Sequence, residues 1–507
     1  MSFKIVNYDI FKRIMSPNIK NPDELPRLYA QIQDWPLWCD AYHMDMSQTR
    51  FFEGRAEIDS TSEAFIRVNP FGGSYNVMAG LGTFLEWLNG WNFSDDLIAW
   101  LGDIKFENGQ QRYKPEFLDF IKNQPLKITV DAMPEGELFF TNEPVVRVSG
   151  PSWQRSIVES ALLNSLNAQS LIATRASRVL YAAGMSTVLE MGLRRALSEY
   201  GLWSTRAAAV GGIILTSNVA AARELGLPIA GTMAHEFVQE YDTELQAFEA
   251  WLRHNPANTT LLTDTFDNKT GVKNAIAASK NTGVKLNQIR IDSGDLAYES
   301  INARAEFRNA GMDSKICLSN DLDETIIESL KHQGAPANTF GLGTKLANPG
   351  ESLGMVYKLK EFGGVAKIKK SNDPIKTTIP GATEIIRILN ADGKYDGDVI
   401  APLGAITENA GALTAPLCSI NADTQRAKIF PAGTQFYKPL INVVRDGRVD
   451  MAVANRPVIE IGRETLRNLS KLDSSHKRLQ NPHRYVAGLE KSLFMRRLEM
   501  TLGDWQH

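Results

Sequence analysis

The fold is decided by residues 287–343, NQIRIDSGDLAYESINARAEFRNAGMDSKICLSNDLDETIIESLKHQGAPANTFGLG. Three short runs within it, at 287–292, 315–320 and 338–343, are rich in residues that favour strands. The chain between these runs is long enough for one helix each time, as in DETIIESLKHQG. Strands that alternate with helices in this way predict β–α units with a parallel sheet.

The same alternation extends toward the N-terminus. Four further runs of strand-forming residues precede the first three, at 186–191, 212–215, 227–231 and 259–264. The spacing is about 20–30 residues for most runs, as one strand and one helix require. At least seven such units predict a closed or nearly closed parallel α/β barrel rather than an open sheet.

Nearly every run ends in polar residues or in glycines. They are Glu190, Thr216, Ser217, Thr232, Asp264, Asp292, Ser319, Asn320, Asp321, Gly341 and Gly343. Polar residues can end any strand, but this explanation fits one or two cases better than seven. Barrel enzymes carry their chemistry at the carboxyl ends of the strands, so we expect these residues to share one site.

Composition indicates a globular protein in a reducing compartment. Of the 507 residues, 43% are hydrophobic and 22% are charged, which predicts two or three domains with substantial cores. The formal net charge of −3 argues against a nucleic-acid partner. The three cysteines are far apart, and we find neither a signal peptide nor an apolar stretch that could span a membrane. We therefore expect a cytoplasmic protein.

The flanks of the repeat predict two further regions. Before it, LKITVDAM and PVVRVSG bracket a turn and indicate adjacent strands. After residue 400 the repeat fades into ordinary globular sequence. We expect an N-terminal α/β domain at 1–150, the catalytic barrel at 151–400, and a C-terminal region at 401–507 that packs on the N-terminal domain.

The segment IRIDSGDL is the richest in chemistry. Arg290 and Asp292 are two residues apart on a strand, so both side chains project from one face, and Asp295 follows after a turn. A guanidinium beside carboxylates can grip a hydroxylated or planar ligand. A structural ion pair is the alternative, and the position at a strand end favours the ligand site.

A phosphate site is predicted on the last two repeats. We expect Ser319, Asn320 and Asp321 to cap a helix that begins near Asp323, which would expose backbone amides at its N-terminus. FGLGTKL then adds Gly341, Gly343, Thr344 and Lys345. Glycine pairs are common in turns, but barrels often bind phosphate on their last two loops.

Three other candidates follow strand ends. His235 lacks a second histidine four residues on, so a metal site is unfavoured and a structural, nucleophilic or proton-transfer role stays open. Arg194 and Arg195 diverge on a helix, so that one can face the site. Asp264 and Asp267 are candidate ligands for magnesium or contacts to ribose.

Twelve strings together resemble the nicotinate phosphoribosyltransferase family. In order they are DAYHMDM, NPFGG, FFTNEPVVRVSGP, ESALLN, EMGLRRAL, TSNVAA, GTMAHEF, LLTDTFD, RIDSGDL, SNDLDE, FGLGTKL and KKSNDPIKTTIPG, spanning residues 40–381. Each string is weak evidence alone, whereas a dozen in the family order are specific.

The resemblance implies an architecture and an activity. The architecture is an irregular α/β barrel like that of type II phosphoribosyltransferases, with an N-terminal α/β domain completed by the C-terminal region. A head-to-tail homodimer would share its active sites between a barrel and the partner's N-terminal domain. The implied reaction joins nicotinate to phosphoribosyl pyrophosphate with Mg²⁺ and coupled ATP hydrolysis, and yields nicotinate mononucleotide and pyrophosphate.

The resemblance also implies residue roles. Tyr42 would stack on the pyridine ring of the neighbouring subunit's site, and Arg194 would face the ring or its carboxylate. Arg290 and Asp292 would bind ribose or pyrophosphate, and His235 would be transiently phosphorylated. The 5-phosphate would lie against residues 319–321 and 341–345.

Ser217 bears on the choice of substrate. Related nicotinamide enzymes have an acidic residue there, which would repel a carboxylate, whereas Ser217 and Asn218 are neutral donors. Nicotinate is therefore favoured, with nicotinamide as the alternative. A non-catalytic, ligand-sensing or secreted signalling relative would be expected to lack His235 or Asp292. A barrel hydrolase or aldolase would need a metal-ligand set or a strand-end lysine, and no strand-end lysine precedes Lys345.

Overall fold

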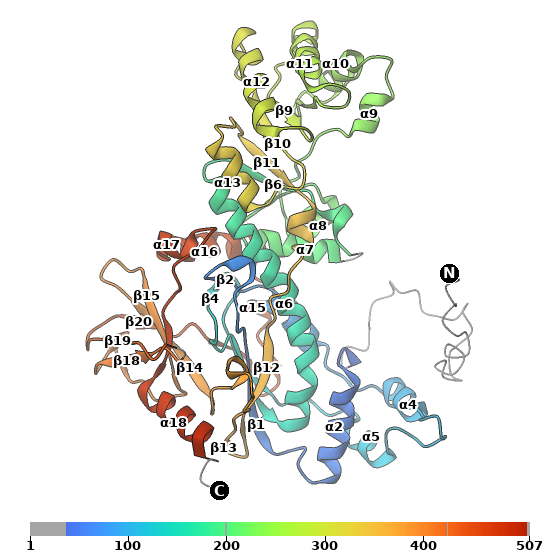
Figure 1. The fold of residues 1–507 in the computed structure, drawn as a ribbon. Coiled ribbons are helices and arrows are strands. Elements are labelled where there is room, and N and C mark those ends of the chain that lie inside the picture. The colour runs from blue at the N-terminus through green and yellow to red at the C-terminus, as the bar shows by residue number, and fades with distance from the viewer. Residues whose placement is uncertain (1–36, 198–199, 423, 504–507) are drawn as a thin grey trace, which may run out of the picture.

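Three large sheets organise the protein, which is described by a computed structural model over residues 37–503 except 198–199 and 423 (Figure 1). One is a seven-stranded sheet of N-terminal and later strands, one is a six-stranded parallel sheet, and one is a six-stranded C-terminal sheet. In Figure 1 the parallel sheet and its helices occupy the upper part, and the other two sheets occupy the lower part.

The parallel sheet is the one that the repeat predicts. Its order is β7-β6-β11-β10-β9-β8, and every neighbouring pair is parallel. The strands are β6 (Thr187–Glu190), β7 (Leu215–Thr216), β8 (Thr260–Leu262), β9 (Gln288–Ile291), β10 (Lys315–Leu318) and β11 (Thr339–Leu342). Between them, α11 (Asn268–Thr282), α12 (Leu296–Asn309) and α13 (Glu324–His332) follow β8, β9 and β10, as β–α units require.

Alternate residues of these strands point to opposite faces of the sheet, one covered by helices and one facing inward. Ile289 and Ile291 of β9 are fully buried in a large apolar core with residues of α11, α12 and α13. Gln288 and Arg290 point the other way and line a cavity of about 150 Å³. Every strand of the sheet contributes to the lining of this cavity, so the sheet curves around it as a half-barrel.

The prediction of a seventh strand at 227–231 is wrong. Among the described residues this run makes a single parallel bridge, between Thr216 and Ile229. It nevertheless reaches the far edge of the sheet, because the Thr232 hydroxyl donates a hydrogen bond to the Thr260 carbonyl of β8 at 2.6 Å. After the short α8 (Val219–Leu225), the neighbouring β7 is only two residues long and offers this run little backbone to pair with.

The N-terminal sheet draws strands from three parts of the chain. Its centre is β1 (Asp59–Phe65), β5 (Val146–Pro151) and β3 (Thr129–Ala132). One edge is β12 (Val356–Phe362) with β13 (Val365–Ala366), and the other is β21 (Ile441–Arg445) with β22 (Arg448–Val449). The strands at residues 356–400, which the sequence division at 151–400 placed with the barrel, lie in the other two sheets.

One long helix, α6 (Ser152–Ala183), runs from the N-terminal sheet to the parallel sheet (Figure 1). Near its end Arg175 and Arg178 both bind the carboxylate of Glu324 on α13, at 2.6 and 2.9 Å. Arg178 and Glu324 are each 1% exposed. A buried carboxylate held by two guanidinium groups is strongly destabilised when either partner is removed, so these ion pairs fix the half-barrel on α6.

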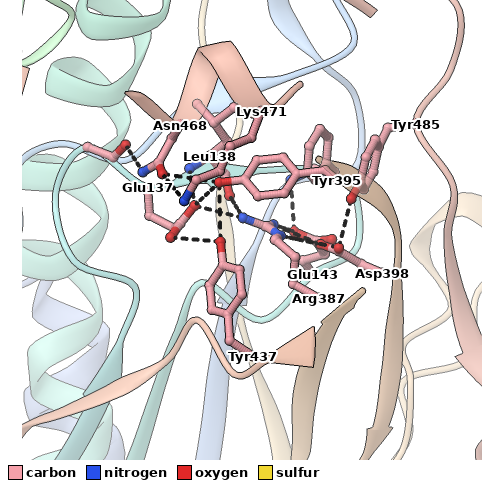
Figure 2. A network of polar contacts seen from close by, with 12 residues as sticks. Glu137, Leu138, Glu143, Arg387, Tyr395, Asp398, Tyr437, Asn468, Lys471 and Tyr485 are labelled. Carbon is pink, nitrogen blue, oxygen red and sulfur yellow. Dashed lines mark hydrogen bonds and ion pairs between the residues drawn. The ribbon is translucent and has the colours of Figure 1, made fainter. Parts of the chain in front are cut away.

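The C-terminal sheet is attached to the N-terminal part through buried Arg387 (Figure 2). Arg387 lies on β14 (Thr383–Leu389) and binds Asp398 of β15 (Tyr395–Pro402) at 2.7 Å. It also donates to Glu137 at 2.8 Å and lies 3.5 Å from Glu143. Tyr395, Tyr437 and Tyr485 bring their hydroxyl groups to the same carboxylates. The sheet order is β19-β18-β23-β15-β14-β20, and it further contains β18 (Leu417–Ile420), β19 (Ala427–Phe430), β20 (Phe436–Tyr437) and β23 (Ala487–Glu490).

Smaller elements complete the described chain. They are the strands β2 (Asn76–Val77), β4 (Leu138–Phe139), β16 (Glu408–Asn409) and β17 (Ala412–Leu413), and the helices α3 (Leu81–Asn89), α4 (Asp95–Asp103), α5 (Pro115–Ile121), α7 (Tyr200–Val210), α10 (Glu244–His254), α15 (Met451–Ala454), α16 (Val458–Lys471), α17 (Ser474–Lys477) and α18 (Lys491–Leu502). In the part of the chain that is described, none of the helices is both long and apolar enough to cross a membrane.

Glu143 is the member of the Arg387 network that titrates abnormally. Burial, followed by the charge of Asp398, raises the pKa of Glu143 well above that of an ordinary carboxyl group. The native protein therefore binds a proton on Glu143 more tightly than the unfolded chain does. By linkage, this group's contribution to stability is present below the ordinary carboxyl pKa and is lost as pH rises toward the raised native pKa.

We predict that Glu143→Gln lessens this loss of stability with rising pH. Glutamine does not titrate, its oxygen can accept from the Phe140 amide as Glu143 does at 2.9 Å, and its NH₂ can donate to Asp398. Thermal unfolding at several pH values between 5 and 8 should show that the melting temperature of the variant rises relative to that of the wild type as pH increases. Parallel curves for the two proteins would show that Glu143 does not titrate in this way.

Candidate functional site

Three strand-end residues form one hydrogen-bonded cluster at the carboxyl edge of the parallel sheet. Arg290 on β9 binds Asp292 just beyond the same strand, with Nη2 and Oδ1 2.9 Å apart. The Arg290 Nε–H also donates to the hydroxyl oxygen of Ser319, which follows β10, at 2.8 Å. Ser319 in turn donates to Asp292 Oδ1. The parallel register that pairs Arg290 with Cys317 places Ser319 within reach of both groups.

Asp264 shapes the turn that carries Asp292. One of its oxygens, Oδ2, accepts from the Asp292 amide at 3.0 Å and from the Ser293 hydroxyl at 2.5 Å. The other, Oδ1, is buried and has no hydrogen-bond partner among the described residues. A carboxylate oxygen left free beside a second carboxylate is a suitable donor for a hard cation such as Mg²⁺.

His235 stands beside this cluster as the first residue of α9 (His235–Gln239). Its Nδ1 is hydrogen-bonded to the Thr265 hydroxyl at 3.1 Å. Its Nε2 lies 4.0 Å from Asp292 Oδ2, and the side chain is 42% exposed. One ring nitrogen is thus held by a neutral partner, and the other is open to solvent beside a carboxylate, as a nucleophile or a proton carrier requires.

The turn after Ser319 differs from the prediction. We expected Ser319, Asn320 and Asp321 to cap the next helix, but the cap of α13 is Asp323, which accepts from the amides of Thr325 and Ile326. Asn320 and Asp321 are exposed and have positive φ angles of 102° and 36°. Residues other than glycine rarely adopt such φ values, and strained backbone of this kind concentrates at ligand sites.

The two glycines of FGLGTKL serve different purposes. A side chain at Gly341 would place its Cβ 2.7 Å from the Met191 sulfur and 3.3 Å from the Ser319 Cβ, so Gly341 allows close packing beside the Arg290 cluster. Gly343 precedes α14 (Thr344–Ala347) and makes Thr344 the first residue of a short helical turn. These residues lie beside the 319–321 turn because β11 pairs with β10.

Arg194 and Ser217 lie at the ends of β6 and β7, which are neighbours in the same sheet. Arg194 is exposed in the short 3₁₀ helix η4 (Leu193–Arg195). Ser217 is half-buried, and its amide donates to the Glu190 carbonyl at 2.9 Å. Asn218, expected to be a second neutral donor to a substrate, is instead 2% exposed, and its side chain caps α8.

Two other predicted site residues have no printed contact with the cluster. Tyr42 is 50% exposed on α2 (Ala41–Phe52), and Figure 1 shows this helix in the lower part of the molecule, whereas β9 lies near the top. Asp267 is the N-cap of α11 and accepts from the Thr270 amide, and these hydrogen bonds lower its pKa. In the described residues no group of three or more histidine, cysteine or acidic side chains is arranged to hold a metal ion.

Thr265 and Ser293 belong to the site and were missed. Both follow a strand end directly, Thr265 after β8 and Ser293 after β9, so the rule that selected their neighbours would have found them. Their partners, the His235 ring and Asp264, could not be read from sequence because each pair joins two different loops.

Comparison with known proteins agrees with this arrangement. The models that match describe the nicotinate phosphoribosyltransferase N-terminal domain over residues 37–167, the family itself over 187–384 and its C-terminal domain over 383–496. The nicotinate phosphoribosyltransferase of Bacillus subtilis is 34% identical over 483 residues, which cover 91% of this chain and 94% of that protein. The chain belongs to the nicotinate phosphoribosyltransferase family. This is a family of enzymes.

Solved structures support the fold of this family member. The structure of human nicotinic acid phosphoribosyltransferase superposes with a TM-score of 0.77 at 26% identity, covering 91% of this chain and 99% of the human chain. A nicotinate-nucleotide pyrophosphorylase from Pyrococcus furiosus shares the fold, with a TM-score of 0.66 at 21% identity over 88% of this chain and 99% of that one. The shared fold is mixed α/β with a parallel half-barrel sheet.

We predict that Ser319→Ala lowers kcat/KM by about 10- to 100-fold, because hydrogen bonds to charged groups contribute about 1.5–3 kcal/mol each. The Ser319 hydroxyl binds both Arg290 and Asp292, so without it neither side chain is held in its present position. The measurement is steady-state kinetics with the substrates proposed below.

Ser314→Ala is the matched control for this variant. Ser314 precedes β10 as Ser319 follows it, and the two serines are 1% and 2% exposed. The Ser314 hydroxyl donates to the Leu286 carbonyl at 2.7 Å, so its loss should cost about 1 kcal/mol of stability and leave kcat/KM unchanged. An equal fall in kcat/KM in both variants would show that Ser319 has no specific role in the site.

Proposed function

We propose that this protein joins nicotinate to phosphoribosyl pyrophosphate, forming nicotinate mononucleotide and releasing pyrophosphate. The observation that carries the proposal is the Arg290–Asp292–Ser319 cluster at the carboxyl edge of the parallel sheet, in a chain of this family. We also propose that the half-barrel is the irregular barrel of a type II phosphoribosyltransferase, with residues 227–232 spanning the gap between β7 and β8.

The chemistry needs positioning and charge more than a covalent nucleophile. The pyridine nitrogen attacks C1 of the ribose while pyrophosphate leaves, through a transition state in which the sugar carries positive charge. Asp292 would accept hydrogen bonds from the ribose hydroxyls, and its charge would favour the developing cation. Arg290 would bind pyrophosphate or ribose oxygens, and Ser319 holds both side chains in place.

The two ends of the substrates would lie on either side of this cluster. On one side, the strained turn at 319–321 and the backbone at 341–345, with Gly341, Gly343 and Thr344, would hold the 5-phosphate. On the other, Ser217 after β7, Thr232 and the exposed Arg194 would surround the pyridine ring. A guanidinium suits the carboxylate of nicotinate, and the neutral Ser217 does not repel it. Nicotinamide, which lacks that charge, is the alternative substrate.

Mg²⁺ and ATP complete the proposed reaction. The free Oδ1 of Asp264 suits a magnesium ion whose remaining ligands are pyrophosphate oxygens and water. Such an ion would neutralise charge on the leaving pyrophosphate. Asp267, capping α11, would contribute only after a rearrangement. We further propose that His235 takes the γ-phosphoryl group of ATP transiently on an imidazole nitrogen, with ADP as the leaving group, and then loses it to water.

The experiment that tests the proposed function is an assay of the purified protein with phosphoribosyl pyrophosphate and Mg²⁺. Nicotinate, nicotinamide and quinolinate are supplied separately, each with and without ATP, and mononucleotide is quantified. We expect product from nicotinate, and more of it with ATP. Product from nicotinamide alone would move the assignment to the alternative, and no product from any base would contradict the proposal. His235→Ala should retain slow synthesis that ATP no longer stimulates, whereas full stimulation in that variant would exclude the phosphohistidine.

We also propose a homodimer in which Tyr42 of one subunit completes the site of the other. Tyr42 is half exposed on α2, which Figure 1 shows well below β9 and β10 of the same chain, so we expect it to stack on the pyridine ring of a partner's site. Its position beside the buried His43, with ring centroids 4.2 Å apart, gives the ring a fixed platform.

Mixing two inactive variants tests the shared site. Tyr42→Ala and Asp292→Asn affect different halves of it, so a heterodimer would contain one intact site. After subunit exchange, an equimolar mixture should recover about a quarter of wild-type activity, because about half the dimers are mixed and one of their two sites is intact.

The control mixes Asp292→Asn with Arg290→Ala, which lie in the same half and should not complement. If the Tyr42→Ala and Asp292→Asn mixture stays as inactive as this control, the site is not shared.

A further inference from the structure

Glu190, at the end of β6, is a buried carboxylate that the proposed reaction does not use. It is 1% exposed. Its Oε1 accepts from the Gly192 amide, and its Oε2 accepts from the hydroxyl groups of Thr205 at 3.2 Å and Thr216 at 2.5 Å. In addition, its carbonyl oxygen accepts from the Ser217 amide at 2.9 Å. One side chain therefore joins β6, the turn before η4, α7 and the end of β7.

These contacts continue into a second layer. The Thr216 hydroxyl oxygen accepts from the Asn218 amide at 2.9 Å. The Asn218 side chain donates to Thr205 at 3.2 Å and to the Gly201 carbonyl at 3.3 Å, and it caps α8. At the edge of this network Ser217 is half-buried, and Arg194 is exposed together with its neighbours Leu193 and Arg195 in η4.

The turn at Gly192 is also tightly packed. A Cβ at Gly192 would lie 2.6 Å from the Ala347 Cβ, 2.9 Å from Glu190 Oε1 and 3.2 Å from the Gly343 carbonyl oxygen. Glycine at this position lets the segment that carries Arg194 lie directly against the 343–347 segment. The Glu190 carboxylate thus fixes the proposed pyridine end relative to the proposed phosphate end.

The partners of this carboxylate are all neutral. No ion pair is seen between Glu190 and any described residue, whereas three other buried carboxylates, Glu63, Glu135 and Glu324, each bind a lysine or an arginine. Burying an anion without a cation costs several kcal/mol unless its hydrogen bonds are well formed. Two threonine hydroxyls and one amide supply these bonds. The same bonds fix the turn at Gly192, which precedes Arg194, and the end of β7, which precedes Ser217.

We propose that Glu190 is a positioning residue for the carboxylate of nicotinate. It acts through Arg194 and Ser217 by fixing the turn at 191–195 and the end of β7, and it contributes little to the binding of phosphoribosyl pyrophosphate. This inference rests on the proposed function. The protein could carry out the proposed reaction even if Glu190 had no selective effect on the affinity for nicotinate, so the two proposals can be tested separately.

The test is Glu190→Gln, measured by steady-state kinetics in both substrates. A glutamine keeps the shape but presents NH₂ where the carboxylate accepts hydrogen bonds, so at least one of its three donors loses its partner. We expect the KM for nicotinate to rise about tenfold or more, and the KM for phosphoribosyl pyrophosphate to change less than about twofold. Thr216→Val removes one of the donors and should also raise the KM for nicotinate. This second variant tests the proposal if Glu190→Gln folds poorly.

A double-mutant cycle with Arg194→Ala shows whether Glu190 acts through Arg194. If it does, Glu190→Gln should raise the KM for nicotinate far less in the Arg194→Ala background than in the wild type. Equal increases in both backgrounds would overturn the proposal, as would parallel increases in KM for both substrates.

Glu63→Gln is the matched control for a lost buried carboxylate. Glu63 lies on β1, is 1% exposed and accepts from the Thr383 amide and hydroxyl, so it has the same kinds of donor, with Lys360 in addition. It should lower thermal stability and leave both KM values unchanged. A selective rise in the KM for nicotinate in this control would show that the effect is general destabilisation. A wild-type protein that makes no mononucleotide at all would contradict the proposed function itself.

Discussion

The ion pair between Arg290 and Asp292, held by the Ser319 hydroxyl, is the interaction on which the rest of the site depends. It exists because β9 and β10 are parallel and in a register that places Ser319 beside both groups. Asp264, on the loop after β8, accepts a hydrogen bond from the Asp292 amide, and His235 Nε2 lies 4.0 Å from Asp292 Oδ2. A slip of β9 by one residue would turn Arg290 into the apolar core, and a slip of β10 would turn Ser319 away from it, because alternate residues face opposite sides of the sheet.

The same scaffold explains why the chain has so much structure outside the half-barrel. Helix α6 carries the parallel sheet through Arg175, Arg178 and Glu324, and its other end packs against α2 and the N-terminal sheet. Arg387 binds the C-terminal sheet to the same body. The ion pairs of α6 hold the half-barrel on the same helix that packs against α2, so the cluster and α2 are fixed relative to each other, as the proposed shared site requires.

Much of the half-barrel could be predicted from sequence, because each strand is followed by a helix and ends in polar residues. Residues 227–231 did not form a full strand because composition does not determine how much backbone the neighbouring strand offers, and the two-residue β7 pairs with this run through Thr216. The helix cap was misplaced because SNDLDE offers several acceptors, and only the backbone shows that Asp323 is the one that caps. Pairs such as Thr265 with His235 were invisible because they join separate loops.

The central claim is that the strand ends of one sheet bind the sugar phosphate at the Arg290–Asp292–Ser319 cluster. A crystal structure of the protein with nicotinate mononucleotide tests this most directly. We expect the ribose hydroxyls against Asp292, the 5-phosphate between the 319–321 turn and the 341–345 backbone, and the pyridine ring toward Arg194. A nucleotide bound with its ribose away from Asp292 and its phosphate away from both loops would contradict the account.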